Sequence, residues 1–286
     1  MVDVSPATIS KWRAGTQAPE RDALERLAGV VNVTPDSFSD GGRHADTASA
    51  LAHALALRSE GAEVLDIGGE STRPGAAPVP LDEEIARVVP LVRALREHGD
   101  EGAISVDTRH APVARAALEA GADIVNDVGG GRDPALLEAV AHAGAALVLM
   151  HMQGEPRTMQ AAPHYDDVVA EVTAFLVAQA EAARARGIER LWLDPGLGFG
   201  KTTQHNLELL AGLERLVAKG PVLLGASRKR FLGELTDEPQ ADRRLAGSLA
   251  AAARGFEAGV AAVRVHDVRA TRQLLDVLEA IRAHRS

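Results

Sequence analysis

Nearly every short apolar run in this 286-residue chain ends in a side chain that can hydrogen-bond or carry a charge. These run-end residues are Asn32, Asp66, Asp107, Asn126, His151, Asp194, Ser227, Lys229, Arg264 and His266. Any one of them could serve as a helix cap or a turn former. Their recurrence after one run following another instead predicts a shared pocket.

The acidic and amide side chains of this set predict a pocket for a flat, polar ring. Asp107 and Asp194 follow buried runs, and each should meet a donor because an unpaired buried carboxylate is costly. A heterocycle with adjacent ring N–H and amino groups would satisfy one of them in a bidentate fashion. Asn126 can both donate and accept, and Lys229 can direct its charge at a ring carbonyl or nitrogen.

The cationic residues predict an anion site on the opposite side of the same pocket. Arg264 and His266 are two residues apart at the end of one run, so both side chains should face the same way. With Arg73 they offer a planar fork for phosphate oxygens and a proton-sensitive donor. Taken alone, each of the three could equally form a surface ion pair.

Two loops of turn-forming residues are expected to lie over this pocket. Residues 32–42 read NVTPDSFSDGG and residues 68–80 read GGESTRPGAAPVP. Loops of this kind exclude water when they close over a substrate, and Phe38 is interpreted as a lid side chain. The stretch DPGLGFGKT at 194–202 superficially looks like a phosphate loop but lacks the spacing of one.

The elements that must position these residues alternate along the chain. Apolar runs without strong alternation are typical of parallel strands that are covered on both faces, and amphipathic helices are expected between them. The expected strands are 28–32, 64–68, 104–107, 124–126, 146–150, 191–194, 222–226 and 262–265. The expected helices are 46–60, 82–98, 110–120, 134–143, 166–186, 205–217, 241–257 and 268–283. Eight such units favour an α/β fold, a (β/α)8 TIM barrel, over a doubly wound open sheet.

Composition narrows the function classes further. The net charge of −9 argues against general nucleic-acid binding, and no apolar run is long enough to span a membrane. Absent cysteines and the lack of an apolar leader fit a cytoplasmic protein. Residues 1–27 do not follow the βα rhythm and are interpreted as an N-terminal extension, either a fragment like a helix-turn-helix or a cap on the barrel. Residues 28–286 would form the barrel.

Eight ordered motifs resemble those of the bacterial dihydropteroate synthases. They are NVTPDSFSDGG (32–42), DIGGESTRPG (66–75), SVDT (105–108), NDV (126–128), LMHMQG (149–154), DPGLGFGKT (194–202), ASRKRF (226–231) and RVHDV (264–268). The resemblance implies a pterin-binding TIM barrel, usually a homodimer. It also implies an Mg²⁺-dependent enzyme that joins 6-hydroxymethyl-7,8-dihydropterin diphosphate to p-aminobenzoate, giving 7,8-dihydropteroate and diphosphate in folate biosynthesis. Sulfonamides compete at such a site.

Residue by residue, the resemblance implies three groups of roles. The pterin ring would be held by Asp107, Asn126, Asp194 and Lys229 and walled by Met150 and Phe199. The diphosphate would face Asn32, Arg264 and His266, with the amide oxygen of Asn32 as the Mg²⁺ ligand and with Thr72 and Arg73 nearby. The p-aminobenzoate site would comprise Phe38, Pro74, Ser227 and Lys229, and Asp40 would help to hold the closed state. A helix expected to start near Arg228 would help Ser227 to bind the p-aminobenzoate carboxylate through its N-terminus.

Three competing interpretations remain at this point. A methyltetrahydrofolate-binding methyltransferase would share the Asp/Asn pterin cradle but would not need the STRPG motif or the Arg264-x-His266 pair. An inactive paralogue serving as a partner protein would keep the motifs without turnover. A DNA-binding regulator would use residues 6–13, although the half-motif and the negative charge disfavour it.

Overall fold

Eight parallel strands form the centre of the molecule. The computed structural model describes residues 26–33, 42–71 and 78–284. The strands are β1 (Arg26–Asn32), β2 (Val64–Gly68), β3 (Ala103–Asp107), β4 (Ile124–Asp127), β5 (Ala146–Met150), β6 (Leu191–Asp194), β7 (Leu223–Leu224) and β8 (Ala262–Val265). Their order in the sheet is β6-β5-β4-β3-β2-β1-β8-β7.

The sheet curls into a nearly closed barrel. β1 pairs in parallel with both β2 and β8, which joins the beginning of the chain to its end. An isolated parallel bridge between Leu193 and Val222 connects β6 to β7, the two strands at the ends of that order. This closure confirms the predicted TIM barrel and rules out the open doubly wound sheet.

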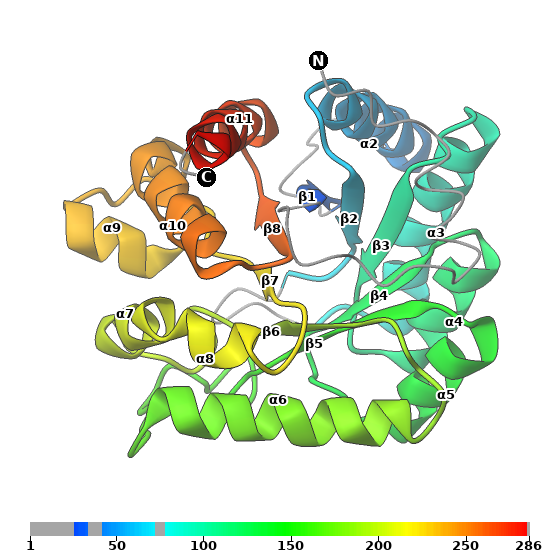
Figure 1. Cartoon of the computed structure of the whole chain (residues 1–286). Helices are drawn as coiled ribbons and strands as arrows, with labels where there is room; N and C mark the ends of the chain where they lie inside the picture. The colour runs from blue at the N-terminus through cyan, green and yellow to red at the C-terminus, as the bar shows by residue number, and fades with distance from the viewer. Residues whose placement is uncertain (1–25, 34–41, 72–77, 285–286) are drawn as a thin grey trace.

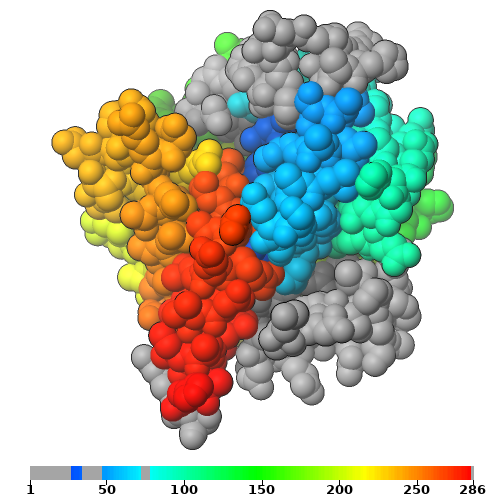
Figure 2. Space-filling model, turned by 90° about the horizontal axis from the view of Figure 1, so that it is seen from above, coloured from blue at the N-terminus to red at the C-terminus, as the bar shows by residue number. Residues whose placement is uncertain are grey.

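Helices connect successive strands and form the outer layer around the barrel (Figure 1). Those in the described ranges are α2 (Gly42–Ser59), α3 (Leu81–Glu97), α4 (Ala111–Glu119), α5 (Pro134–Ala143), α6 (Val168–Arg184), α7 (Thr203–Ala211), α8 (Leu213–Val217), α9 (Arg230–Thr236), α10 (Leu245–Ala258) and α11 (Val268–Ala283). Seen from above, α11 lies between α10 and α2, so the last helix lies beside the first βα unit (Figure 2). None of the helices described combines the length and apolar character needed to cross a bilayer.

The burial of the strands explains why their sequences show no alternation. Every residue of β2 and β5 is buried, because one face meets the barrel interior and the other meets the helices. The interior holds a cluster of mostly small side chains around Trp192, whereas Leu, Ile and Val fill the larger layer between strands and helices. The low aromatic content therefore fits a core built mainly of aliphatic side chains.

Several elements differ from the expected ranges. β1 begins at Arg26, because Arg26 and Leu27 pair with Ala262 and Val263 of β8. The single helix expected over 205–217 is two helices, α7 and α8, broken at Gly212. β7 is only two residues long, and the helix expected to start near Arg228 is the seven-residue α9, which begins at Arg230. A three-residue 3₁₀ turn precedes α10, which shortens the helix expected over 241–257.

One arginine ties together the N-terminal ends of two strands, on the face away from the strand-end polar residues. Arg96 donates to the carbonyls of Asp100, Gly102 and Gly121 at 2.7–3.0 Å and to Asp123 Oδ2 at 2.5 Å. Asp123 Oδ2 also accepts from the backbone N–H of Ile104 at 2.9 Å. The N-terminal face of such a barrel contributes stability rather than chemistry.

We expect Arg96→Met to destabilise the chain without affecting binding or turnover. Asp123 and three carbonyls would lose their donor, at a cost of about 2–3 kcal/mol in the free energy of unfolding after allowance for partial exposure. Urea denaturation measures this loss. Arg93→Met, on the exposed side of the same helix, is the matched control and should change stability little. An equal loss in both variants would contradict the assignment.

Candidate active site

A guanidinium and two carboxylates meet at the C-terminal end of the barrel. Arg264 Nε donates to Asp66 Oδ2 at 2.5 Å, and Arg264 Nη2 donates to Asp107 Oδ2 at 2.8 Å. The Asn126 side-chain amide also donates to Asp66 Oδ2, at 3.2 Å. Four side chains from β8, β2, β3 and β4 thus form one connected network, which we call the polar floor.

Strand register explains why these residues converge. Gly68 pairs with Asp107, and Asp107 pairs with Asn126, so the last two lie at one level on neighbouring strands. Arg264 pairs with Ala28 of β1, and β1 separates it from β2. The long side chain of Arg264 spans this separation, which is possible only because the barrel closes between β1 and β8.

The polar floor corrects one expectation and adds one residue. Arg264 was expected on the opposite side of the pocket from Asp107, but the two are in direct contact. Asp66 was recognised as a polar residue of its strand but received no role in the site. Asp66 was counted among the run-end residues, but it lies in the middle of β2, two residues before its end, and no role was assigned to it individually. Its signal is that a buried strand interior contains a carboxylate at all.

Three oxygens of the polar floor have no hydrogen-bond partner among the described residues. They are the Oδ1 atoms of Asp66, Asp107 and Asn126, and all three are buried. Buried polar atoms are normally satisfied. Those of Asp107 and Asn126 are therefore available to donors of a bound molecule, as the predicted ring site requires.

A second group surrounds Asp194 at the end of β6. Asp194 Oδ1 accepts from the Gly196 N–H at 2.7 Å. Lys229 Nζ donates to the Leu197 carbonyl and lies 4.5 Å from the centre of the Phe199 ring. Phe199 in turn packs against an apolar cluster that contains Met150. The predicted wall residues are thus in one assembly with the predicted lysine.

Burial shifts the pKa values of these groups away from their ordinary ranges. Desolvation raises the pKa of Asp107 to about 7, although Arg264 opposes the shift. It also raises the pKa of Asp194, against the opposing charge of Lys229. Burial lowers the pKa of Lys229 to about 8, with Asp194 opposing. Burial alone would lower the pKa of Arg264, but Asp66 and Asp107 raise it overall, so the guanidinium remains charged. Clustered shifts of this kind are typical of functional sites.

Ser227 and His266 form a second contact between strand ends. Ser227 Oγ lies 3.1 Å from His266 Nδ1 and accepts from the His266 N–H at 3.2 Å. The neighbouring residues reinforce this contact, since Arg228 makes a two-point ion pair with Asp267 at 2.6 and 3.0 Å. Sequence reasoning expected a helix to start near Arg228 and to assist Ser227. The helix begins instead at Arg230, so Ser227 lies outside its first turn.

The loop residues predicted for the site cannot be placed. Phe38, Asp40, Thr72, Arg73 and Pro74 lie outside the described residues. Asn32 is described, at the end of β1. A Cβ atom on Gly68 would lie 3.8 Å from Asn32 Oδ1 and 3.6 Å from the Asp107 Cβ, so this glycine separates the amide from the polar floor. Amide and carboxylate oxygens are the hard donors that Mg²⁺ prefers, so the residues present fit that ion.

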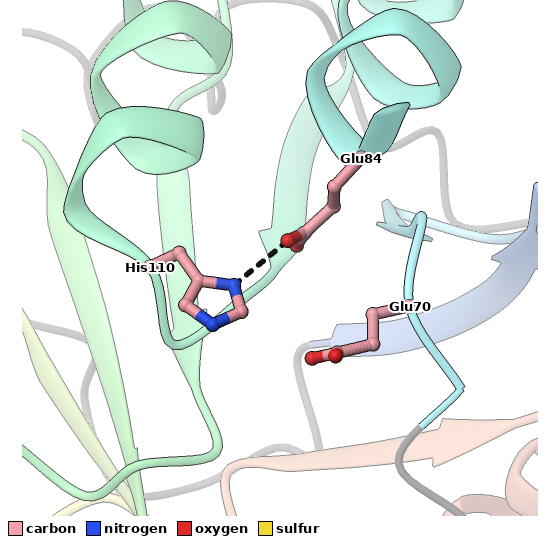
Figure 3. Close-up of side chains that lie close together, drawn as sticks. All are labelled: Glu70, Glu84 and His110. Carbon is pink, nitrogen blue, oxygen red and sulfur yellow. Dashed lines mark hydrogen bonds and ion pairs between the residues drawn. The ribbon is translucent and has the colours of Figure 1, made fainter. Parts of the chain in front are cut away.

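A separate cluster is formed by Glu70, which follows β2, Glu84 on α3, and His110, which follows β3 (Figure 3). One ligand atom from each lies within 4.8 Å of the others, which is compatible with a metal ion. Glu84 is fully buried, and its oxygens already accept from Thr108 Oγ1 at 2.7 Å and pair with His110 Nδ1 at 2.8 Å. This hydrogen bond raises the pKa of His110. The cluster therefore links α3 to the residues that follow Asp107.

Comparison with known proteins shows which enzyme family this chain belongs to. A family model described as pterin binding enzyme matches residues 28–266. The dihydropteroate synthase of Mycobacterium leprae is 50% identical over 267 residues, which cover 89% of this chain and 93% of the relative. The chain belongs to the pterin-binding enzymes and, within them, to the dihydropteroate synthase family.

Solved structures of the same family resemble the whole barrel. The Xanthomonas albilineans dihydropteroate synthase with 4-aminobenzoic acid is 50% identical, with a TM-score of 0.86 and coverage of 94% of this chain and 97% of that one. The same enzyme in complex with 7,8-dihydropteroate is 48% identical, with a TM-score of 0.83 and coverage of 93% and 96%. The Yersinia pestis enzyme in a sulfonamide complex is 43% identical, with a TM-score of 0.86 and coverage of 93% and 97%.

The raised pKa of Asp107 predicts a pH-dependent stability. The pKa of Asp107 in the folded chain is about 7, whereas the pKa of an aspartate in an unfolded chain is about 3.9. Between these values the folded chain binds more protons than the unfolded chain, so the free energy of unfolding falls as the pH rises. Asp107→Asn removes this contribution, and its stability should fall less steeply between pH 4 and 7. Urea denaturation across this range measures the two slopes. Asp276→Asn, exposed on α11, should keep the wild-type slope, and parallel curves for Asp107→Asn would refute the prediction.

Proposed function

We propose that this chain is an active dihydropteroate synthase. It joins 6-hydroxymethyl-7,8-dihydropterin diphosphate to p-aminobenzoate and releases 7,8-dihydropteroate and diphosphate. The observation that supports this most is the polar floor, where unpaired oxygens of Asp107 and Asn126 lie beside the guanidinium of Arg264. The family relatives and their ligand-bound structures support the same activity.

The pterin ring would rest on the polar floor. Asp107 and Asp194 would accept from its ring N–H and amino groups, and Asn126 and Lys229 would address its carbonyl and ring nitrogens. Met150 and Phe199 would cover its faces. The hydrogen bonds select a ring with this pattern of donors and acceptors, because an isostere without them would leave buried groups unpaired.

The diphosphate would lie toward Arg264 and His266, with Arg73 and Thr72 from the second loop. Arg264 is held by Asp66 and Asp107, so its charge is pre-positioned at the border between ring and leaving group. Asn32 would hold Mg²⁺ through its amide oxygen. When bound, the ion would offset the negative charge that develops on the leaving group.

The reaction replaces a C–O bond by a C–N bond. The bond between the pterin methylene carbon and diphosphate breaks, and its electron pair leaves with diphosphate. The p-aminobenzoate nitrogen gives its lone pair to the methylene and then loses a proton. A reduced pterin stabilises positive charge at the methylene, which favours a dissociative, SN1-like path. The arylamine is already a competent nucleophile, so a strong general base is not required.

The p-aminobenzoate site would comprise Phe38, Pro74, Ser227 and Lys229, and sulfonamides would compete there. The loops that carry Phe38, Asp40 and Pro74 would exclude water, which would otherwise trap a cationic methylene. We also propose a cytoplasmic homodimer, in line with the family resemblance.

Two alternatives make different predictions. An inactive paralogue would bind the pterin without releasing diphosphate. A methyltetrahydrofolate-binding methyltransferase would bind a pterin but would not depend on p-aminobenzoate. The contact between Ser227 and His266 beside the polar floor favours the synthase, because a methyltransferase has no diphosphate to hold.

Diphosphate release that depends on p-aminobenzoate tests the proposed activity. With Mg²⁺ and both substrates, the wild-type chain should release one diphosphate per dihydropteroate formed. We expect Arg264→Ala to lower kcat/KM by about 10²-fold, because a preorganised charge is lost. Asp107→Asn should lower kcat/KM by about tenfold or more, because a ring acceptor becomes a donor. Asp276→Asn is the control. Normal turnover in both site variants would show that the site assignment is wrong.

Ser227→Ala separates two roles for the hydroxyl. If Ser227 binds the p-aminobenzoate carboxylate, the variant should raise KM for p-aminobenzoate about tenfold and leave KM for the pterin substrate unchanged. Steady-state kinetics with each substrate varied in turn gives both values. A selective rise in KM for the pterin diphosphate would mean instead that Ser227 acts through His266.

A further inference from the structure

Lys201 is a buried lysine that the proposed reaction does not use. Only 3% of the Lys201 surface is exposed to solvent. Lys201 Nζ lies 3.0 Å from the carbonyls of Gly196 and Phe199, 3.4 Å from the His151 carbonyl and 2.9 Å from His151 Nδ1. Four acceptors therefore surround one amine.

The protonation states follow from these surroundings. Burial and the nearby Lys201 lower the pKa of His151 to about 3, so the imidazole is neutral at neutral pH and its Nδ1 can accept a hydrogen bond from Lys201. Burial also lowers the pKa of Lys201 well below its ordinary value, although the charge of Asp194 opposes that shift. Four acceptors match an ammonium with three donors better than a neutral amine with two. The charge is thus solvated by backbone carbonyls and a neutral imidazole.

Lys201 is bonded to both ends of a short loop, residues 195–200, which we call the glycine loop. Gly196, Gly198 and Gly200 all have positive φ, at 62°, 81° and 63°. A Cβ on Gly196 would lie 1.9 Å from the His151 carbonyl, and one on Gly200 would lie 2.5 Å from the Gln153 carbonyl. The loop therefore lies directly against the segment after β5, where only glycine fits.

The glycine loop carries contacts of the ring site. The Gly196 N–H donates to Asp194, the Leu197 carbonyl accepts from Lys229, and the Phe199 ring lies under the Lys229 ammonium. Lys201 accordingly holds the carbonyls of Gly196 and Phe199, the residues on either side of the Leu197–Gly198 turn. Moving these two carbonyls would move the acceptor of Lys229 and the ring beside it.

We propose that Lys201 is a positioning residue for the pterin site, holding the glycine loop against the end of β5 so that Leu197 and Phe199 fix Lys229 beside Asp194. This inference rests on the proposed function for the identity of the ligand. It predicts that Lys201 contributes to pterin binding without touching the pterin and contributes little to p-aminobenzoate binding. Removing the outer partners of a ligand-holding group typically costs about tenfold or more in affinity.

The test compares Lys201→Met with Lys219→Met, which changes an exposed lysine two residues after the end of α8. Calorimetry with 6-hydroxymethyl-7,8-dihydropterin, which lacks the diphosphate and cannot react, gives Kd without turnover. We expect Kd and KM for the pterin to rise about tenfold in Lys201→Met. KM for p-aminobenzoate should stay within about twofold of the wild type, and Lys219→Met should match the wild type in every value.

A second variant keeps the test decisive if Lys201→Met does not fold. His151→Phe keeps an aromatic ring against Phe175 and removes both ring nitrogens, including the Nδ1 acceptor of Lys201. We expect His151→Phe to raise Kd for the dihydropterin by a smaller factor than Lys201→Met does. Variants that lose stability in urea but keep the wild-type Kd and the same ratio of KM values would overturn the proposal, because Lys201 would then be merely structural.

The same measurements separate this inference from the proposed function. A wild-type chain that binds the dihydropterin but releases no diphosphate would refute the synthase activity alone, and the Kd values would still decide the role of Lys201. A wild-type chain that does not bind the dihydropterin would refute both.

Discussion

The ion pairs of Arg264 with Asp66 and Asp107 determine which charges and which unpaired oxygens lie at the mouth of the barrel. Two carboxylates and a guanidinium are largely removed from water there, and their separate burial would be costly. The guanidinium is divided between them, one nitrogen to each, so neither carboxylate is fully neutralised. Asp107 keeps an unpaired oxygen, and burial raises its pKa although Arg264 opposes the shift. A donor-rich ring would complete this network, and a charged leaving group beside it would meet the same cation.

An arginine is the centre of a hydrogen-bonded cluster at each end of the barrel, but the two clusters have different roles. At the N-terminal end, the donors of Arg96 meet carbonyls and one carboxylate, which leaves no part of that cluster in need of a ligand. At the C-terminal end, the hydrogen bonds of Arg264 leave the Oδ1 atoms of Asp66, Asp107 and Asn126 without a partner among the described residues. Full satisfaction stabilises the fold, and incomplete satisfaction creates a site. The two partly buried arginines therefore differ in whether their surroundings keep unpaired oxygens.

The sequence predicts the barrel because its eight apolar runs must each be covered on both faces. Few folds other than a barrel bury eight such strands in this way. It also predicts the pocket, since polar residues at the ends of parallel strands must meet at one edge. It could not predict that Arg264 reaches Asp107, because that depends on closure between β1 and β8 and on the length of the side chain. Asp66 belonged to the strand-end pattern, but that pattern does not show that its carboxylate binds Arg264 rather than a ligand. The break at Gly212 and the shortness of β7 depend on local packing, which periodicity does not record.

The stretch DPGLGFGKT shows how a similar pattern can have an opposite physical role. A loop that binds phosphate presents free backbone N–H groups and a free lysine to an anion. Here the N–H groups of Gly196 and Gly198 are already donated, to Asp194 and to Asn206 Oδ1 at 2.8 Å. Two of the loop's carbonyls turn toward Lys201 instead, so the loop solvates a cation of its own chain. Glycines with positive φ are needed in either case, because both arrangements bring backbone very close to its partner. The spacing of glycines therefore indicates close approach, and the direction in which the peptide groups point determines whether an anion is bound or a buried ammonium is held.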